Sequence, residues 1–330
     1  DAKAVITDAY EKSRATPVEA PAAEAELKWA YTDFGAPGKV TKREHVADLD
    51  LTLITFANGV RLNVKKTDFE ANRIRVGTRV GRGAIMQPAD KPGLANLAGS
   101  TFVGGGLGKH SADDLRRILA GKNVGAGFGA GQDSFAINGT TTKTDLLLEM
   151  QLIAARIMDP GYRPESLRQA RKGLEEAYLS FEHTLNGPLA LDVSRLIVSG
   201  DTRFGLPPKD EMLARNLEEV SAWLTPELTR GKIEVSIVGD LDLDATVDAV
   251  AHTLGALPVR SSETIPDSLR QVAFPSQPFA KEYRVDTEIP RGLVRTYWPT
   301  TDGIDIKRTR RLNLLGSIVS DRLQIGRAHV

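Results

Sequence analysis

The chain has 330 residues, which at ~150 residues per domain suggests about two domains. Its 43 Lys and Arg balance 43 Asp and Glu, so the formal net charge is zero. This balance excludes the strong basic field by which nucleic-acid-binding and membrane-surface proteins attract their partners. The 41% hydrophobic and 26% charged content is that of an ordinary globular chain. No stretch approaches the ~18 apolar residues of a membrane span.

Cysteine is absent, which excludes disulfides, thiol nucleophiles and thiolate metal sites. The histidines are five in number, and no two of them are three or four residues apart: His45, His110, His183, His252 and His329. No helix can therefore present two imidazoles on one face. We expect His183 and His252 to be satisfied or solvated side chains.

The first elements of the main domain are expected after residue 44. Residues 1–15 predict the end of a helix that belongs to an upstream domain, and the Ala-, Pro- and Glu-rich stretch 17–26 predicts a linker. Alternation on both sides of Asn58-Gly59 predicts a β-hairpin with a two-residue turn. Alternation over residues 72–82 predicts a further strand, with Ile74 on its inward face.

A helix is predicted over residues 93–103, and Ser111 with Asp114 resembles a capping box at the start of a short helix. Strands are predicted over 123–131 and 134–142. The first of these strands carries glycine at every second position from 125 to 131. Such a bare face allows another backbone or a helix to approach closely.

Helical periodicity dominates the next hundred residues. It predicts helices over 143–158, from Pro164 to Phe181, over 189–198 and up to Trp223. A strand over 233–238 and a helix over 243–254 follow. Strands combined with helices of this length predict a two-layer α+β domain over residues 45–260.

The remainder of the chain predicts the start of a second domain of the same kind. Residues 261–281 form a second linker, strands are predicted over 282–288 and 292–298, and an amphipathic helix begins near Ile304. We expect this domain to cover 282–325. Residues 326–330 resemble the translation of a common sequencing adapter, and we expect them to be an artefact.

The glycine clusters do not fit a nucleotide-binding loop. A phosphate loop ending at Gly108-Lys109 would need glycine in place of Val103 and Ser or Thr in place of His110. His110 beside Asp113 and Asp114 has two interpretations. It could be a general base with an orienting carboxylate, but capping of a helix already explains Ser111 and Asp114, and we favour the structural role.

Five short segments follow one another in an informative order. They are residues 55–61 (TFANGVR), 92–95 (PGLA), 104–108 (GGGLG), 159–162 (DPGY) and 237–240 (IVGD). Their order resembles the pitrilysin/insulinase family of zinc metallopeptidases, especially the bacterial envelope branch related to pyrroloquinoline-quinone-locus proteases. The resemblance covers most of residues 45–260 and continues to about Gln324. It implies a two-layer mixed sheet with helices on one face, as in insulinase and mitochondrial processing peptidase domains.

The resemblance also implies which positions matter for chemistry. Active domains of this family carry His-x-x-Glu-His on the helix after the Gly-x-Ala segment, and a distal Glu on a later helix. The matching positions here are Asn96, Gly99 and Ser100, and Glu175 or Glu176 falls near the distal ligand. An amide, a hydrogen and a hydroxyl do not hold a catalytic zinc ion. The family's substrate-steadying Arg and Tyr belong to a stretch after Gln324, so we assign no residues to them.

We therefore expect a non-catalytic, substrate-enclosing segment of a zinc metallopeptidase, without catalytic residues or metal of its own. By resemblance, the zinc belongs to a catalytic half of the same polypeptide, the ligand is a peptide, and the location is the periplasm or envelope of a bacterium. No nucleic acid and no membrane span is expected. Two alternatives are a structural or binding subunit of a separately encoded protease, and an independent enzyme that uses His110 and Asp114.

Overall fold

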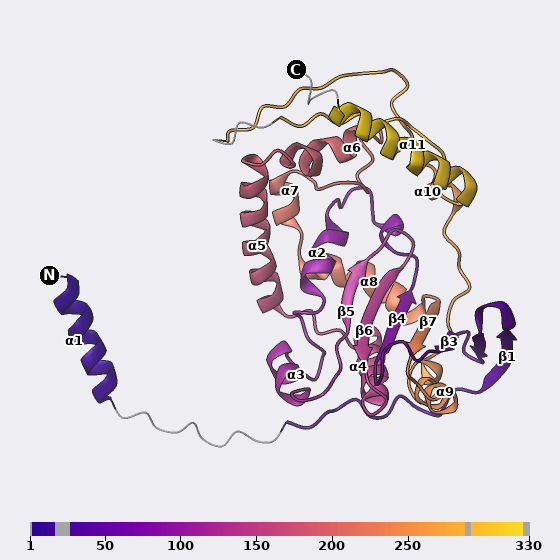
Figure 1. The fold of residues 1–330 in the computed structure, drawn as a ribbon. Coiled ribbons are helices and arrows are strands. Elements are labelled where there is room, and N and C mark those ends of the chain that lie inside the picture. The colour runs from indigo at the N-terminus through magenta and orange to yellow at the C-terminus, as the bar shows by residue number, and fades with distance from the viewer. Residues whose placement is uncertain (1, 17–26, 288–291, 326–330) are drawn as a thin grey trace.

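Residues 2–16, 27–287 and 292–325 are described by a computed structural model, whose body is a seven-stranded sheet with helices (Figure 1). The strand order across the sheet is β1-β2-β3-β7-β4-β6-β5. All neighbouring strands are antiparallel except β3 and β7, which are parallel. The strands are β1 (Val40–Val46), β2 (Leu51–Phe56), β3 (Arg61–Lys66), β4 (Ile74–Val80), β5 (Gly127–Ala130), β6 (Phe135–Thr141) and β7 (Ile233–Gly239).

One face of the sheet carries the core, and the strand sequences explain why. In β4 the side chains of Ile74, Val76 and Val80 are buried, whereas Arg75 and Arg79 between them are exposed. The same alternation runs through β3 and β7. Because a strand has a period of two, this pattern places most apolar side chains of β3, β4 and β7 on the face that the helices cover. The predicted two-layer α+β fold with a mixed sheet is confirmed.

The helices that contact the sheet come from distant parts of the chain: α2 touches β5, α4 touches β6 and α9 touches β3. The capping box of Ser111 with Asp114 forms at α3 as predicted, and Asn216 with Glu219 forms a second one at α8. The helices are α1 (Ala2–Ala15), α2 (Leu94–Thr101), α3 (Ala112–Ile118), α4 (Leu146–Met158), α5 (Pro164–Glu182), α6 (Ser194–Leu196), α7 (Lys209–Ala214), α8 (Leu217–Arg230), α9 (Leu243–Ala251), α10 (Asp267–Arg270) and α11 (Ile306–Ile325).

The turn between β2 and β3 differs from the prediction. Its loop has three residues, because the Gly59 amide bonds to the Phe56 carbonyl and the Phe56 amide bonds to the Val60 carbonyl. Gly59 takes the positive φ of 88° that such a loop requires. The buried Asn58 side chain donates to the carbonyls of Leu254 and Leu257, which lie 196 and 199 residues further along the chain. This long-range contact explains the turn better than local propensity does.

Two helix predictions need correction. Residues 189–198 form a short π-helix, Leu189–Val193, followed by the single turn α6, in place of one α-helix. In α4, the apolar spacing predicts Leu147 on the core-facing side, but it is 47% exposed, whereas Glu149 in the same helix is fully buried. Met150 and Ile153 are buried as the same spacing predicts, and Gly139 of β6 leaves room for the Glu149 carboxylate beside them.

The strands predicted over 282–288 and 292–298 are wrong for the described residues, 281–287 and 292–298, which adopt no regular structure. A two-stranded hairpin without further strands or a covering helix is marginal in water, which accounts for the difference. The helix predicted after it forms as α11, with an apolar side that includes Ile318 exposed to solvent. The linker predicted over 17–26 and the artefact expected over 326–330 lie outside the described residues.

The boundary expected at residue 45 is too late. The sheet begins at Val40, and the extended segment 27–38, here called the strap, lies against the domain. Tyr31 of the strap is only 7% exposed and belongs to the hydrophobic core. By contrast, α1 buries no side chain and lies apart from the body (Figure 1). Within the described residues no helix is both long and apolar enough to cross a membrane.

Candidate functional site

The three positions that resemble the zinc motif lie on one exposed side of α2. Asn96, Gly99 and Ser100 face solvent, whereas Leu97 and Ala98 of the same helix are buried in the core. The Ser100 hydroxyl donates to the Asn96 carbonyl at 2.9 Å. A Cβ atom added at Gly99 would meet no atom within 4 Å. This side of the helix is therefore open, and its shape leaves room for larger side chains.

Glu175 and Glu176 are exposed on α5, a helix that contacts α2. The two sets of positions thus lie on neighbouring helices, as the resemblance implies for a motif helix and its distal ligand. The donor set does not fit zinc, because Asn96 offers an amide, Gly99 offers no side chain and the Ser100 hydroxyl is bonded within its own helix. No group of three or more metal-ligating side chains occurs within residues 2–16, 27–287 and 292–325.

His110 has a structural role in the strap contact. Its Nε2 atom accepts a hydrogen bond from the Ala30 amide at 3.1 Å, and its ring stacks on Trp29. Only 5% of the residue is exposed, and this burial lowers the pKa of the imidazole. Asp114 is engaged in the capping box and holds the Ser111 amide. The nitrogen that a general base would use to accept a proton, Nε2, is therefore occupied by the Ala30 amide.

The strap was missed in the sequence, although it makes specific contacts with the domain. The Trp29 indole donates to Gln151 Oε1 at 3.0 Å. The Tyr31 hydroxyl donates to the Asp159 carboxylate at 2.6 Å and accepts from the Lys109 amide at 2.8 Å. Burial and the bond to Asp159 raise the pKa of Tyr31 to about 12. The only sequence signal is a group of three aromatic residues, Trp29, Tyr31 and Phe34, in a segment that otherwise lacks periodicity.

Glu149 was also missed, and it fixes the start of the β5 region. Its Oε2 atom accepts from the Gly125 amide at 2.8 Å, and its Oε1 atom is buried without a hydrogen-bond partner. A Cβ atom at Gly139 would lie 1.8 Å from Oε1, so only glycine fits there. Burial raises the pKa of Glu149 to about 7. Arg156, two turns later on α4, is buried too, and burial lowers its pKa to about 10.

The face of the sheet that points away from the core is here called the open face. Its side chains are exposed or half-buried throughout the body, and its central row runs across the strands in the order Asn63, Ser236, Gly77, Asn138 and Gly127. The row contains only amides, a hydroxyl and glycines. A surface of this kind is wettable and low in relief, unlike the apolar surface of a permanent interface.

An aromatic series fixes the free edge of the sheet at β5. Phe128 of β5 stacks on Phe102 at 4.1 Å between ring centroids and on Phe135 at 6.0 Å, and Phe135 meets Trp223 edge-on. These contacts join the end of α2 to β5, β6 and α8. The end of α2 and the β5 edge are therefore held together as one rigid corner.

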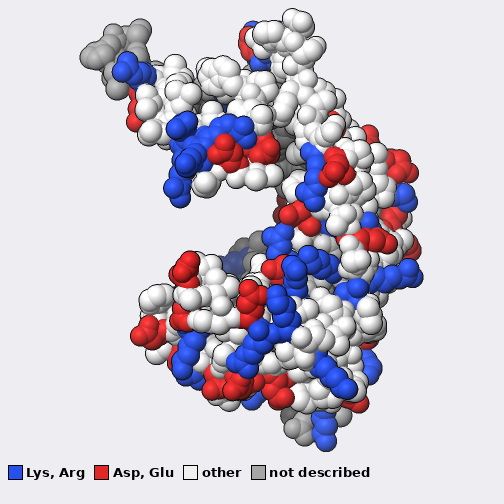
Figure 2. All heavy atoms as spheres, turned by 90° about the vertical axis from the view of Figure 1, so that its right-hand side faces the viewer, with Lys and Arg blue, Asp and Glu red and all other residues white. Residues whose placement is uncertain are grey.

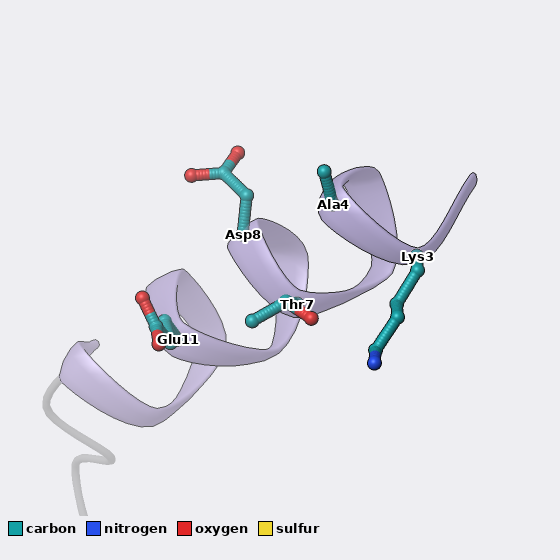
Figure 3. Close-up of a pocket in the computed structure, with 5 residues that line it drawn as sticks. All are labelled: Lys3, Ala4, Thr7, Asp8 and Glu11. Atoms are coloured by element: carbon teal, nitrogen blue, oxygen red, sulfur yellow. The ribbon is translucent and has the colours of Figure 1, made fainter. Parts of the chain in front are cut away.

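The surface carries two further hollows, one on α1 and one on a side of the molecule. The hollow in Figure 3 is lined by Lys3, Ala4, Thr7, Asp8 and Glu11, all from one exposed side of α1, and it forms no enclosed site. Figure 2 shows that one side of the molecule is hollowed, with Lys and Arg atoms on both sides of the hollow.

Comparison with known proteins finds similarity to proteases. No family model matches the sequence. The chloroplastic stromal processing peptidase of Arabidopsis thaliana is 22% identical over 241 residues, which are 72% of this chain and 19% of that protein. The corresponding peptidase of Pisum sativum is 21% identical over 223 residues, 67% of this chain and 18% of that protein. The chain thus spans about a fifth of the length of these relatives.

Solved structures give the same answer for the fold. The periplasmic protease PqqL from Escherichia coli superposes with a TM-score of 0.67 at 18% identity, over 81% of this chain and 29% of that one. A peptidase M16 inactive domain from Pseudomonas fluorescens gives 0.55 at 14% identity, over 66% and 53%. Pitrilysin gives 0.52 at 14% identity, over 71% and 27%. The seven-stranded domain therefore has the α+β fold of pitrilysin and related proteases, as the resemblance in the sequence predicted.

Proposed function

We propose that this chain is the non-catalytic, substrate-enclosing part of a zinc-dependent metalloendopeptidase that acts on peptides or proteins. The observation that carries the proposal is the chemistry of the exposed side chains on α2. In a fold shared with proteases, the helix that resembles the zinc helix presents Asn96, Gly99 and Ser100 to solvent. These groups neither ligate zinc nor activate water.

Two further features support an enclosing role. The open face is broad, polar and uncovered, and such a surface suits transient contact with a passing peptide. A solved domain with this fold carries the description of an inactive domain, so an inactive protease domain of this fold has a precedent. On this proposal the zinc ion belongs to a catalytic half of the same polypeptide, and the protein acts in a bacterial envelope.

Metal content and hydrolysis test the proposal directly. The purified chain is exposed to a zinc salt, freed of excess metal and analysed by mass spectrometry, and hydrolysis of casein is measured on the same sample. We expect far less than one zinc ion per chain and no hydrolysis. Stoichiometric zinc or casein cleavage by the natural chain would refute the proposal.

The matched control is the triple variant Asn96→His, Gly99→Glu and Ser100→His. All three positions are exposed, and the space beside Gly99 accepts a side chain, so we expect the variant to fold. Two imidazoles at i and i+4 share one helix face, so the variant should retain more zinc than the natural chain. This gain shows that the assay detects zinc at α2.

The alternative of a separate binding subunit is distinguished by composition. An antibody raised against this chain isolates the protein that contains it from a denatured extract of the source cells. A single polypeptide predicts that this protein also yields peptides with a His-x-x-Glu-His motif, whereas their absence supports a subunit that pairs with a separately encoded protease.

A further inference from the structure

Four cationic side chains frame the centre of the open face. The register places Arg61 of β3 beside Glu234 of β7, which lies beside Arg79 of β4. A second row lies four residues away on each strand. In it, Lys65 of β3 lies beside Val238 of β7, which lies beside Arg75 of β4. We call Arg61, Lys65, Arg75 and Arg79 the cation frame.

Strand geometry sets the size of the frame. Arg61 and Arg79 lie two strand spacings apart, or roughly 10 Å, as do Lys65 and Arg75. Along each strand the two cations are four residues apart, or roughly 13 Å. Between them the surface is low, because its central positions are Asn63, Ser236 and Gly77.

Local carboxylates neutralise this frame only weakly. Glu234 is the one acidic side chain in the two rows that join β3, β7 and β4, and Asn63 donates to it at 2.8 Å. Arg75 pairs with Glu70, and Arg79 pairs with Asp133, at 2.8 and 2.9 Å.

Both of these carboxylates are about half exposed, at 44% for Glu70 and 55% for Asp133. Exposed pairs of this kind contribute only ~0–1 kcal/mol, so another carboxylate can replace either partner. Arg61 forms no ion pair with any residue of the described parts of the chain.

We propose that the cation frame binds an acidic stretch of extended polypeptide. In an extended chain, carboxylates at positions i and i+4 are roughly 13 Å apart, which matches the spacing from Arg61 to Lys65 and from Arg75 to Arg79. The amides of Asn63 and Asn138 can bond to the main chain of such a peptide. The idea rests on the proposed function, since it assigns a substrate class to the enclosing surface.

A polypeptide fits this surface better than a nucleic acid does. The rows of the open face that join β3, β7 and β4 contain no aromatic side chain on which bases could stack. The chain as a whole is neutral, so it has no overall positive field that would attract a nucleic acid.

Fluorescence anisotropy with labelled peptides tests the proposal on the full chain. The probe is a Ser/Thr-rich peptide with Glu at every fourth position, and its matched control has Gln in place of Glu. Arg61→Gln combined with Arg79→Gln removes one cation from each strand of the frame. We expect this double variant to bind the Glu peptide about tenfold more weakly than the natural chain does at low ionic strength. We expect no binding of the Gln peptide by the natural chain.

Arg168→Gln combined with Lys172→Gln is the matched control variant, because it removes two exposed cations from α5. It should bind the Glu peptide within about twofold of the natural chain. An equal loss in this variant, equal binding of the Gln peptide, or equally tight binding of a single-stranded oligonucleotide would overturn the proposal. Zinc and casein assays on the same preparations show separately whether the proposed function fails.

Discussion

At the scale of single residues, Glu149 makes stability depend on pH. Burial raises the pKa of this carboxyl from 4.5 to about 7 in the folded state. Between these two values the folded chain binds more protons than the unfolded chain, so the free energy of unfolding must fall as the pH rises through this window. The difference in pKa corresponds to roughly 3 kcal/mol.

Glu149→Gln keeps an oxygen acceptor for the Gly125 amide but cannot ionise. We expect the natural chain to lose stability relative to this variant between about pH 5 and 8. Urea unfolding at several pH values measures the difference. Parallel pH profiles for the two proteins would show that Glu149 does not carry the effect.

His110 produces a pH dependence of the opposite sign. Its Nε2 atom accepts from the Ala30 amide, so the strap contact requires an unprotonated nitrogen, and burial lowers the pKa of the imidazole. A lowered pKa contributes stability that is complete above about pH 6.5 and is lost as the pH falls below it. Asp114 opposes this shift, whereas Arg163 and Lys109 support it.

Hydrogen exchange at the Ala30 amide measures this contact. We expect its protection factor, corrected for intrinsic exchange, to fall between about pH 7.5 and 5 in the natural chain. In His110→Gln the side-chain oxygen can accept at either pH, so protection should not change. A protection factor of the natural chain that is independent of pH would contradict this role.

At the scale of elements, the capping box at α8 has a measurable effect. The Asn216 side chain accepts from the Glu219 amide at 2.9 Å, and Glu219 accepts from the Asn216 amide. Asn216→Ala leaves the Glu219 amide without its acceptor at the helix start and should destabilise the protein by ~1 kcal/mol. Asn216→Ser restores an acceptor and should recover most of that loss, as denaturant midpoints at constant slope would show. Equal midpoints for all three proteins would exclude the cap as a stabilising feature.

Elements were predictable where periodicity is local, and contacts were not where their partners are distant. The alternation around Ile74 predicts β4, and Pro164 predicts the start of α5. By contrast, Trp29 and Tyr31 bond to side chains 122 and 128 residues away, which no local pattern encodes. The polarity of Glu149 argued for an exposed position, and only the missing side chain of Gly139 makes its burial possible.

The candidate site follows the same rule. Its positions on α2 could be proposed because the resemblance depends on a contiguous segment, and all three lie on the exposed side of that helix. The cation frame required the sheet order, since Arg61 and Arg79 lie on strands that become near neighbours only through β7. Both arginines looked like ordinary outward-facing strand residues in the sequence.

At the scale of the whole molecule, the strap attaches whatever precedes it to a fixed corner of the domain. Trp29 bonds to Gln151 of α4, and Tyr31 bonds to Asp159, the residue that follows α4. Residues 2–16 bury no side chain, so the chain before the strap contributes nothing to the core within the described residues. The boundary of the folding unit therefore lies between these segments.

Two deletions test this boundary. Removal of residues 1–26 should leave the thermal midpoint of the domain unchanged, whereas removal of residues 1–38 should lower it by several degrees. The longer deletion removes Tyr31 and exposes the part of the core that its ring covers, removes the partner of His110 and leaves Asp159 without its phenol donor, each at a cost of ~1–2 kcal/mol. Tyr31→Phe in the shorter deletion serves as the intermediate, because it loses both hydrogen bonds but keeps the ring. Equal midpoints for the two deletions would show that the strap is a passive linker. Midpoints that fall from the natural chain to the Tyr31→Phe variant and then to the longer deletion would establish the strap as part of the fold.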